Sequence, residues 1–416
     1  RNSVALVHAD LDGFQRYNDS FGYAAGDDLL VSVADRLSAA VSADLPPRTQ
    51  ATFARIGGDE FVVALCGPTA DEAADALADQ WVKCLQTPFM REETELFLSL
   101  SMGIASTTNS ACDFESLMKE AGTALNAGKA TGNGNTRKFH EDMACETLDR
   151  VQLESRLRVA LRNDKLDLHY QPKYCTVTGR IVGVEALLRW HDEKLGSVSP
   201  CKFIPLAEQT GLIMDINKWV VTHVCRQLRS WSGLGFEIPV SFNLSAAEFI
   251  HGDPVRLIAA ACESHDVSPS LLEVEITEST LMYDVEAACE CLTQLRGMGV
   301  SISIDDFGTG YSSLAYLKRF NLDTLKIDRS FVEGITADGS ENGICRAVIA
   351  LARSLSLKVV AEGVETTEQN DWLVAESCDY VQGFLWSRPV PAREIQLLLL
   401  EASQGTQNRP RGIAAA

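Results

Sequence analysis

Polar residues of a few types follow the apolar stretches in the second half of this 416-residue chain. In chain order they are Gln171, Glu185 and Arg189, Asn243, Glu275 and Glu278, Asp305 and Asp306, Lys326, Glu362 and Gln382. Carboxylates gathered in one place repel each other unless cations lie among them. Such oxygen ligands select Mg²⁺ or Mn²⁺, whereas a zinc site would use His or Cys. The residues therefore predict a site for divalent cations, and the alternative is a solvated acidic rim that holds no ion.

Eight candidate strands must position these residues. They are Lys165–Tyr170, Ile181–Leu188, Ile238–Asn243, Leu271–Ile276, Val300–Ile304, Thr324–Ile327, Lys358–Ala361 and Tyr380–Phe384. Helical patterns separate most of them, for instance at Pro254–Ser264, Glu286–Gly297 and Gly343–Leu355. Strands and helices that alternate in this way predict a TIM-like (β/α) barrel, in which chemistry lies at the carboxyl ends of the strands. Polar residues follow nearly every one of these strands.

The first half of the chain has a shorter rhythm of strands and helices. Thr52–Arg55 and Phe61–Leu65 flank Gly57–Glu60, which predicts a hairpin with a glycine-rich tip. Apolar residues alternate from Leu96 to Ile104, which predicts one half-buried strand. Apolar residues at helical spacing predict helices near 30–41, 73–85 and 114–125, the last capped by Asp113. We therefore expect an α/β chain whose first domain is α+β, with an antiparallel sheet covered by helices.

Composition excludes several classes of partner. Asp and Glu number 57 against 37 Lys and Arg, a formal net charge of -20, so DNA, RNA and anionic lipid surfaces are not expected to bind. The 12 cysteines form no C-x-x-C pair, and the apolar runs are too short to cross a bilayer, so we expect reduced thiols and a cytoplasmic location. The sequence begins at Arg1, so we expect a piece of a longer parent that carries an upstream sensor or membrane region.

Five segments of the second half resemble the EAL-domain cyclic di-GMP phosphodiesterases. These segments are GVEALLRW around Glu185, IDDFGTGYSSLAYLKRF from Ile304, LKIDRSFV from Leu325, VVAEGVET from Val359 and CDYVQGFLWSRP from Cys378. The resemblance implies hydrolysis of cyclic di-GMP to linear pGpG with two Mg²⁺ or Mn²⁺ ions. It also implies a homodimer formed through this domain.

The resemblance assigns a role to each matching position. The metal ligands would be Glu185, Asn243, Glu275, Asp305 and Asp306, with Asp305 bridging both ions. The catalytic residues would be Glu185, Lys326, Glu362, Asp305, Asp306 and Glu278, where Lys326 contacts the attacking water and Glu278 works with the loop Phe307–Ser313. The substrate would be bound by Gln171 near a guanine, Arg189 at a phosphate, Leu187 and Gln382.

These residue types suit the hydrolysis of a phosphodiester. Two ions can hold the nucleophilic oxygen, lower its pKa and neutralise the non-bridging oxygens during in-line attack. Lys326 can orient the hydroxide or offset charge in the transition state. The alternative for Lys326 is an ordinary ion pair with Asp306 or Glu362, and the two roles are compatible.

Two segments of the first half resemble the GGDEF domain of diguanylate cyclases. They are ADLDGFQRYNDSFGYAAGD from Ala9 and ARIGGDEF from Ala54. The resemblance implies Mg²⁺ at Asp10 and Glu60, and GTP bound by Asn18, Asp27, Gly57, Gly58, Asp59 and Lys129. Of these, Asn18 and Asp27 would contact guanine and Asp59 the 3′-hydroxyl. The alternative is that the two glycines form only a turn.

Departures from the GGDEF pattern affect the phosphate side of this site. Gln15 stands where a lysine is usual, Asn126 where a tyrosine is usual and Asn133 where an arginine is expected. Each lost cationic contact would cost about 1.5–3 kcal/mol of GTP binding. We therefore expect a regulatory GGDEF domain that binds GTP and condenses it poorly. The alternatives are a bifunctional cyclase and phosphodiesterase, and a catalytically inactive cyclic di-GMP receptor.

The expected domain organisation has four parts. A GGDEF domain that lacks its opening segment occupies 1–141, and a linker helix with Leu148, Val151, Leu157 and Leu161 on one side occupies 142–162. The EAL barrel occupies 163–403, and the Gly-, Pro- and Ala-containing tail 404–416 is expected to be disordered.

Overall fold

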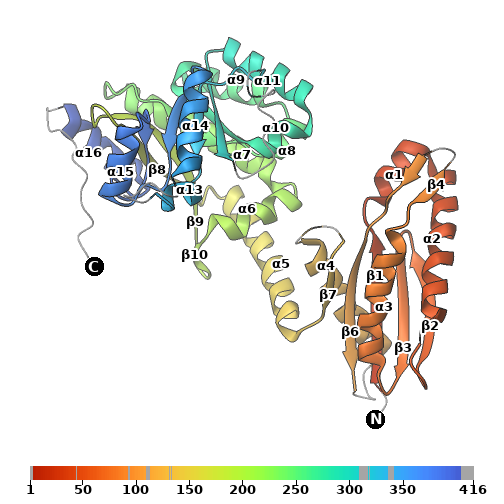
Figure 1. The fold of residues 1–416 in the computed structure, drawn as a ribbon. Coiled ribbons are helices and arrows are strands. Elements are labelled where there is room, and N and C mark those ends of the chain that lie inside the picture. Colours follow the sequence, from red (N-terminus) through yellow and green to blue (C-terminus); the bar gives the residue numbers. More distant parts are fainter. Residues whose placement is uncertain are drawn as a thin grey trace. The chain divides into compact units, whose positions relative to one another are not determined.

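The computed structural model of the chain describes residues 3–43, 45–91, 94–108, 113–130, 132, 134–308, 317, 319–335 and 342–403. The chain divides into two compact units, residues 1–152 and 153–416 (Figure 1). The helix α5 (Glu141–Arg162) runs across the boundary between them. Leu157 of α5 is buried in the core of the second unit, whereas Val151 is exposed, so the expected apolar side of this helix is only partly present.

The first unit is built on one five-stranded sheet in the order β2-β3-β1-β6-β7. Its strands are β1 (Ser3–Leu11), β2 (Gln50–Gly57), β3 (Glu60–Gly67), β6 (Leu100–Thr107) and β7 (Thr136–Lys138). All pairs are antiparallel except β6–β7. The β2–β3 pair confirms the predicted hairpin. This sheet also confirms the expected α+β class.

Helices cover both faces of this sheet. Ala5 and Val7 of β1 pack in a core with α2 (Tyr23–Ala43) and α3 (Ala70–Leu85). Leu6, between them on the strand, packs in a separate core with α4 (Phe114–Ala130), because successive side chains of a strand point to opposite faces. The Asp113 side chain accepts a hydrogen bond from the Ser116 N–H at 2.7 Å, which confirms the predicted cap of α4. A short helix, α1 (Phe14–Phe21), follows β1.

The prediction of one half-buried strand from Leu96 to Ile104 was wrong. Leu96 ends β5 (Thr94–Leu96), which pairs with β4 (Phe89–Arg91) in a separate hairpin, and β6 begins at Leu100. Residues 100–105 are buried on both faces. The small residues Ser101 and Gly103 stand between the apolar residues and gave the appearance of a polar face. Both are in fact enclosed: Ser101 is buried and bonded to Asp12, and Gly103 lies against the α4 backbone.

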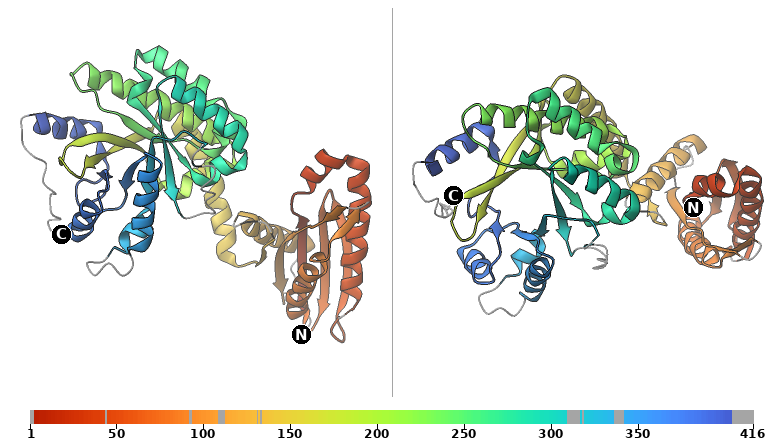
Figure 2. Two further views of the ribbon diagram at one scale, coloured as in Figure 1. Left: turned by 45° about the horizontal axis from the view of Figure 1, so that its top comes forward. Right: turned by 90° about the horizontal axis from the view of Figure 1, so that it is seen from above.

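The second unit is a closed barrel of eight strands, which confirms the predicted architecture (Figure 2). In barrel order the strands are β8 (Leu166–Cys175), β9 (Ile181–Asp192), β11 (Val240–Asn243), β12 (Leu272–Thr277), β13 (Ser301–Phe307), β14 (Thr324–Ile327), β15 (Lys358–Ala361) and β16 (Tyr380–Val381). The main surrounding helices are α6 (Pro200–Gln209), α7 (Leu212–Ser232), α9 (Pro254–His265), α11 (Val285–Gly297), α14 (Gly343–Ser354), α15 (Thr367–Ala375) and α16 (Ala392–Ser403). Shorter elements are β10 (Gly196–Val198), β17 (Val390–Pro391), α8 (Ala246–His251), η1 (Pro269–Leu271), α10 (Glu278–Tyr283) and α13 (Arg329–Glu333).

The first barrel strand differs from the expected pattern. β8 runs antiparallel to both of its barrel neighbours, β9 and β16, whereas the other neighbouring pairs are parallel. A short turn joins β8 to β9, with the Gly179 N–H bonded to Cys175 O, and so short a connection allows only antiparallel pairing. Gln171 was expected at the end of its strand. It lies instead inside β8, opposite Glu185 on β9.

Two further findings concern the described part of the chain. None of its helices combines the length and apolarity that a membrane span requires. Ten of the cysteines in this part of the chain, from Cys66 to Cys378, are free thiols.

Candidate active site

The ammonium group of Lys326 on β14 is the centre of the site. Its Nζ lies 2.6 Å from Glu275 Oε2, 2.6 Å from Glu362 Oε1, 3.1 Å from Asp305 Oδ1 and 3.8 Å from Glu185 Oε2. The lysine is 1 % exposed and Glu275 is fully buried. Four carboxylates from β9, β12, β13 and the end of β15 therefore meet inside one end of the barrel, as the sequence predicted.

Three amides complete this cluster around Glu185. The Asn243 amide donates to Glu185 Oε1 at 3.0 Å, and the Gln382 amide donates to Oε2 at 2.6 Å. The same Gln382 nitrogen lies 3.1 Å from Gln171 Oε1, and Gln171 in turn donates to the Ser387 carbonyl at 3.0 Å. Both oxygens of Glu185 are thus held in place by side chains that are far from Glu185 in the sequence.

Burial and the crowding of like charges shift the pKa values in this cluster. Burial, together with the neighbouring Glu275, raises the pKa of Glu185 to about 8, although Lys326 opposes this shift. Burial likewise raises the pKa of Glu362 to about 7. Burial disfavours the charge on Lys326, but the surrounding carboxylates outweigh it and raise its pKa well above the usual value. At Glu185 and Glu362, burial and the neighbouring carboxylates thus outweigh the Lys326 ammonium group.

Sequence reasoning missed two charged residues beneath this cluster. Lys173 on β8 lies 2.9 Å from Glu275 Oε1 and 3.3 Å from Glu273 Oε2, and it is 3 % exposed. Glu273 precedes Glu275 by two positions on β12, and Lys173 follows Gln171 by two positions on β8. A spacing of two places both residues of each pair on the same face of the strand, and this spacing is visible in the sequence. A prediction based on strand ends alone does not include Lys173 and Glu273.

The donor set fits a hard divalent cation. Its groups are carboxylate and amide oxygens. The Gln382 Oε1 atom is buried and has no hydrogen-bond partner among the described residues, so an acceptor oxygen is free at the cluster. Within the described ranges, no three acidic, histidine or cysteine side chains are grouped as a metal-binding cluster. The carboxylates surround the Lys326 ammonium group instead, so a metal ion must share or replace that contact.

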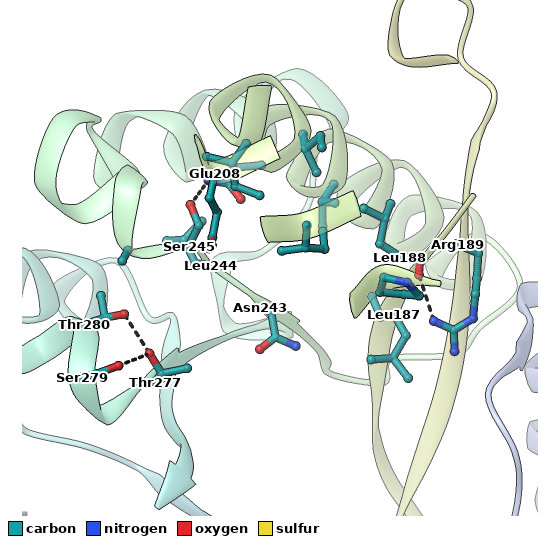
Figure 3. Close-up of a pocket in the computed structure, with 18 residues that line it drawn as sticks. Leu187, Leu188, Arg189, Glu208, Asn243, Leu244, Ser245, Thr277, Ser279 and Thr280 are labelled. Carbon is teal, nitrogen blue, oxygen red and sulfur yellow. Dashed lines mark hydrogen bonds between the residues drawn. The ribbon is translucent and has the colours of Figure 1, made fainter. Parts of the chain in front are cut away.

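A cavity of about 540 Å³ lies beside this cluster, between β9, β11, α6 and α7 (Figure 3). Leu187, Arg189 and Asn243 line it, which brings three of the predicted residues to one space. The Arg189 guanidinium donates to the Leu188 carbonyl at 2.8 Å, and burial lowers its pKa. The walls are otherwise largely apolar, with Pro200, Ile204 and Val220 among them. Such a space suits a small, partly apolar ligand with an anionic group near Arg189.

Asp306 lies at the edge of the cluster, and Glu278 lies at the start of α10. The Asp306 N–H donates to the Asp305 carboxylate at 3.0 Å, and the Asp306 backbone has φ 54°. Burial, followed by the charge of Asp305, raises the pKa of Asp306. Glu278 begins α10 and is buried, with no described partner for its Oε2. In the predicted loop Phe307–Ser313, positions 309–313 lie outside the described residues.

The candidate GTP site in the first unit brings Asp10 and Glu60 together. These two residues face each other across the β1–β3 pair. Lys129 Nζ lies 2.5 Å from Asp10, and burial raises the pKa of Asp10 in spite of this contact. His8 Nε2 lies 3.5 Å from Glu60. Lys129 is thus a partner of the predicted metal ligand.

The rest of the predicted GTP site lies on α1, on α2 and at the hairpin tip. Asn18 packs against Gly26, where an added Cβ would lie 1.9 Å from Asn18 Oδ1, and the neighbouring Asp27 is exposed. Gly57 and Gly58 of the tip have open space where side chains would lie, and Asp59 follows them. Asn133 lies outside the described residues.

Comparisons with known proteins match both units. The family model for the EAL domain matches residues 154–389, and that for the diguanylate cyclase GGDEF domain matches residues 1–135. The chain is 43% identical over 394 residues to the bifunctional diguanylate cyclase/cyclic di-GMP phosphodiesterase MucR of Pseudomonas aeruginosa, covering 94% of this chain and 56% of the relative. It is 40% identical over 397 residues to the cyclic di-GMP phosphodiesterase NbdA of the same organism, covering 95% and 50%. The chain therefore spans about half the length of these relatives.

A solved structure also resembles the second unit. It is the PaMucR phosphodiesterase in complex with c-di-GMP, which is 48% identical with a TM-score of 0.57. The match covers 59% of this chain and 99% of the other chain.

Proposed function

This chain belongs to the family of tandem GGDEF–EAL proteins, and we propose that its barrel hydrolyses cyclic di-GMP to linear pGpG. One observation carries the proposal: Glu185, Asn243, Glu275, Asp305 and Lys326 converge beside a cavity that Arg189 lines. The relatives MucR and NbdA are named as cyclic di-GMP phosphodiesterases, and the solved PaMucR structure is a complex with c-di-GMP, which supports the proposal.

The metal ions would be Mg²⁺ or Mn²⁺, held by Glu185, Asn243, Glu275, Asp305 and Asp306. When bound they supply the activation of water and the neutralisation of the phosphate oxygens. Carboxylate and amide oxygens without His or Cys support these ions over zinc. The unsatisfied Gln382 Oε1 and the carboxylates grouped around Lys326 support a site that accepts a cation.

The chain's own residues would bind the substrate and move the proton. Arg189 would hold a phosphate, while Leu187 and the cavity would receive a guanine, with Gln171 and Gln382 at its edge. Glu362 and Lys326 contact each other directly at 2.6 Å, and both would contact the attacking water from the same side. Because burial raises the pKa of Glu362 to about 7, this carboxylate suits a group that accepts a proton near neutral pH. Lys326 would offset the charge that develops on the phosphate.

The first unit would bind GTP and regulate the barrel. Asp10 and Glu60 would hold Mg²⁺, Asn18 and Asp27 would contact guanine, and the open space at Gly57 and Gly58 would admit the phosphates. A second candidate function is cyclase activity, which the adjacent Asp10 and Glu60 favour. The missing cations at Gln15 and Asn133 favour binding over condensation. We also propose a homodimer formed through the EAL domain and an upstream sensor or membrane region in a longer parent.

Nucleotide separation after incubation distinguishes these functions. The purified chain is incubated with Mg²⁺ and either cyclic di-GMP or GTP, and the products are resolved by chromatography. Formation of pGpG that EDTA abolishes supports the proposed phosphodiesterase. Cyclic di-GMP formed from GTP shows the bifunctional enzyme. Binding of cyclic di-GMP without turnover shows a receptor and overturns the proposal.

A further inference from the structure

Lys173 is a buried cation with no role in the function proposed above. We infer that Lys173 is a positioning residue that fixes the orientation of the Glu275 carboxylate in the metal site. This inference rests on the proposed metal site, and it concerns Glu275 as a ligand rather than the identity of the nucleotide.

Lys173 reaches Glu275 across the interior of the barrel. It belongs to β8, whereas Glu275 and Glu273 belong to β12, and the strands β9 and β11 lie between them in the barrel order. Lys173 pairs with Gly183, two positions before Glu185 on β9. Glu273 likewise lies two positions before Glu275. Lys173 and Glu273 therefore form a layer of side chains beneath the carboxylates around Lys326, because alternate residues of barrel strands point inward.

Lys173 holds the oxygen of Glu275 that is turned away from the site. Glu275 Oε1 accepts from Lys173 at 2.9 Å, whereas Oε2 accepts from Lys326 at 2.6 Å. Lys326 also contacts Glu362 and Asp305, so its ammonium group can follow several carboxylates and does not define one orientation of Glu275. The contact with Lys173 does, because it fixes Oε1 and leaves Oε2 facing the other carboxylates. Partners that orient a ligand in this way typically change metal affinity by about 10–100-fold.

If Lys173 orients Glu275, its removal should weaken the binding of a divalent cation. If Lys173 acts only through its charge, its removal should strengthen that binding. A cation close to a metal site repels the metal, so removing its charge alone strengthens the binding of a divalent cation. Loss of the contact with Oε1 allows Glu275 to turn and weakens binding. The sign of the change in metal affinity therefore separates the two roles.

The experiment measures Mn²⁺ binding to the full chain without nucleotide, with free Mn²⁺ followed by electron paramagnetic resonance. Asp10→Asn is present in every protein compared, so that the site proposed in the first unit does not contribute. Four proteins are compared: the unmodified chain, Lys173→Met, Glu273→Gln, and the double variant Lys173→Met/Glu273→Gln. We expect Lys173→Met to weaken Mn²⁺ binding about tenfold or more. Glu273→Gln is the matched control, since it removes the other partner of Lys173 and keeps the contact with Glu275. It should show only the small weakening of Mn²⁺ binding that the loss of one nearby anion causes, and far less than Lys173→Met.

The double variant separates orientation from charge. It loses one cation and one anion, so the net charge of the barrel interior is unchanged, and it should bind Mn²⁺ as weakly as Lys173→Met. If Lys173→Met fails to fold, the double variant alone carries the test. Unchanged or tighter Mn²⁺ binding in the folded Lys173 variants overturns the inference. An unmodified chain that binds no Mn²⁺ overturns the metal site itself, and one that binds Mn²⁺ without forming pGpG overturns only the proposed reaction.

Discussion

The side-chain amide of Gln382 donates to Glu185 at 2.6 Å, although the two residues are 197 positions apart in the chain. Together with the Asn243 amide, this bond holds both oxygens of Glu185 in one orientation. A carboxylate fixed at a cluster of other carboxylates is suited to bind a cation and costs free energy without one. If the proposed metal binds here, the arrangement that orients Glu185 as a ligand would also favour the metal-bound chain over the metal-free one.

Replacement of Glu185 by glutamine should remove activity and leave the barrel folded. Glu185→Gln keeps the size of the side chain but removes the charge proposed to bind metal, so we expect pGpG formation to fall at least about 100-fold. The measurement is the initial rate at saturating Mg²⁺, with thermal unfolding as the check on folding. Asp305→Ala should be equally severe because that residue is proposed to bridge both ions. Turnover within tenfold of the unmodified chain in either folded variant contradicts the metal assignment.

Mg²⁺ should stabilise the chain more at alkaline than at acidic pH. The pKa of Glu185 is raised to about 8 and that of Glu362 to about 7, both above the unfolded value of 4.5. The folded metal-free chain therefore binds more protons than the unfolded chain between about pH 4.5 and 8, and it loses stability as the pH rises through this window. A bound cation offsets that loss. Thermal unfolding with and without Mg²⁺ should show a larger stabilisation at pH 8.5 than at pH 5.5, and an equal shift at both contradicts the assignment.

Gly103→Ala should destabilise the first unit and spare the barrel. An added Cβ would lie 2.0 Å from the Ala121 carbonyl oxygen and 2.3 Å from the Leu125 nitrogen, both backbone atoms of α4. Overpacking of this kind costs about 1–3 kcal/mol or more. The matched control is Gly122→Ala, where the nearest atom would be His8 Nδ1 at 3.7 Å. Calorimetry should show a lower temperature for one unfolding transition in Gly103→Ala and no such change in Gly122→Ala. The Gly103→Ala protein should still form pGpG. Loss of hydrolysis would show that the barrel needs an intact first unit.

The sequence predicted the barrel and most of its site because strand ends and polar residues coincide. Asn243, Glu275 and Lys326 lie at or near the ends of short parallel strands. Their positions at the ends of apolar stretches in the sequence were therefore sufficient to predict that they lie close together. Gln171 was assigned to the right cluster for the wrong structural reason, since its strand runs the other way. Strand direction depends on the β8–β9 turn, which the alternation of residues does not reveal.

Lys173 and Glu273 were not predicted as part of the site, for a different reason. Lys173 and Glu273 lie inside their strands, where a charged residue in a sequence is usually read as solvent-facing. Only the closed barrel shows that both point inward and neutralise each other. A similar reason explains β6, whose small residues Ser101 and Gly103 suggested an exposed face. In each case tertiary burial on both sides of a strand overrode the local pattern.

GTP should raise the rate of cyclic di-GMP hydrolysis. The first unit keeps Asp10, Glu60, Asn18 and Asp27, while Gln15 replaces the usual lysine, which suits binding more than condensation. The helix α5 begins in this unit, continues across the boundary and buries Leu157 in the core of the barrel, so the two units share one continuous helix. GTP can activate only if it binds the active arrangement more tightly than the inactive one. A tenfold difference in affinity corresponds to about 1.4 kcal/mol and would be readily measured as a change in rate.

The test is the initial rate of pGpG formation against GTP concentration at fixed Mg²⁺. Asp27→Ala should shift the activation curve to higher GTP, because Asp27 is exposed on α2 beside the Asn18–Gly26 contact and is proposed to bind guanine. Leu157→Ala tests the helix, since loss of its packing in the barrel core should reduce the ratio of rates with and without GTP while GTP affinity stays the same. ATP serves as the control nucleotide, because it chelates Mg²⁺ equally and lacks the guanine contacts. A rate that does not change with GTP, with binding confirmed by calorimetry, would leave the first unit as a cyclase or a scaffold and exclude this form of regulation.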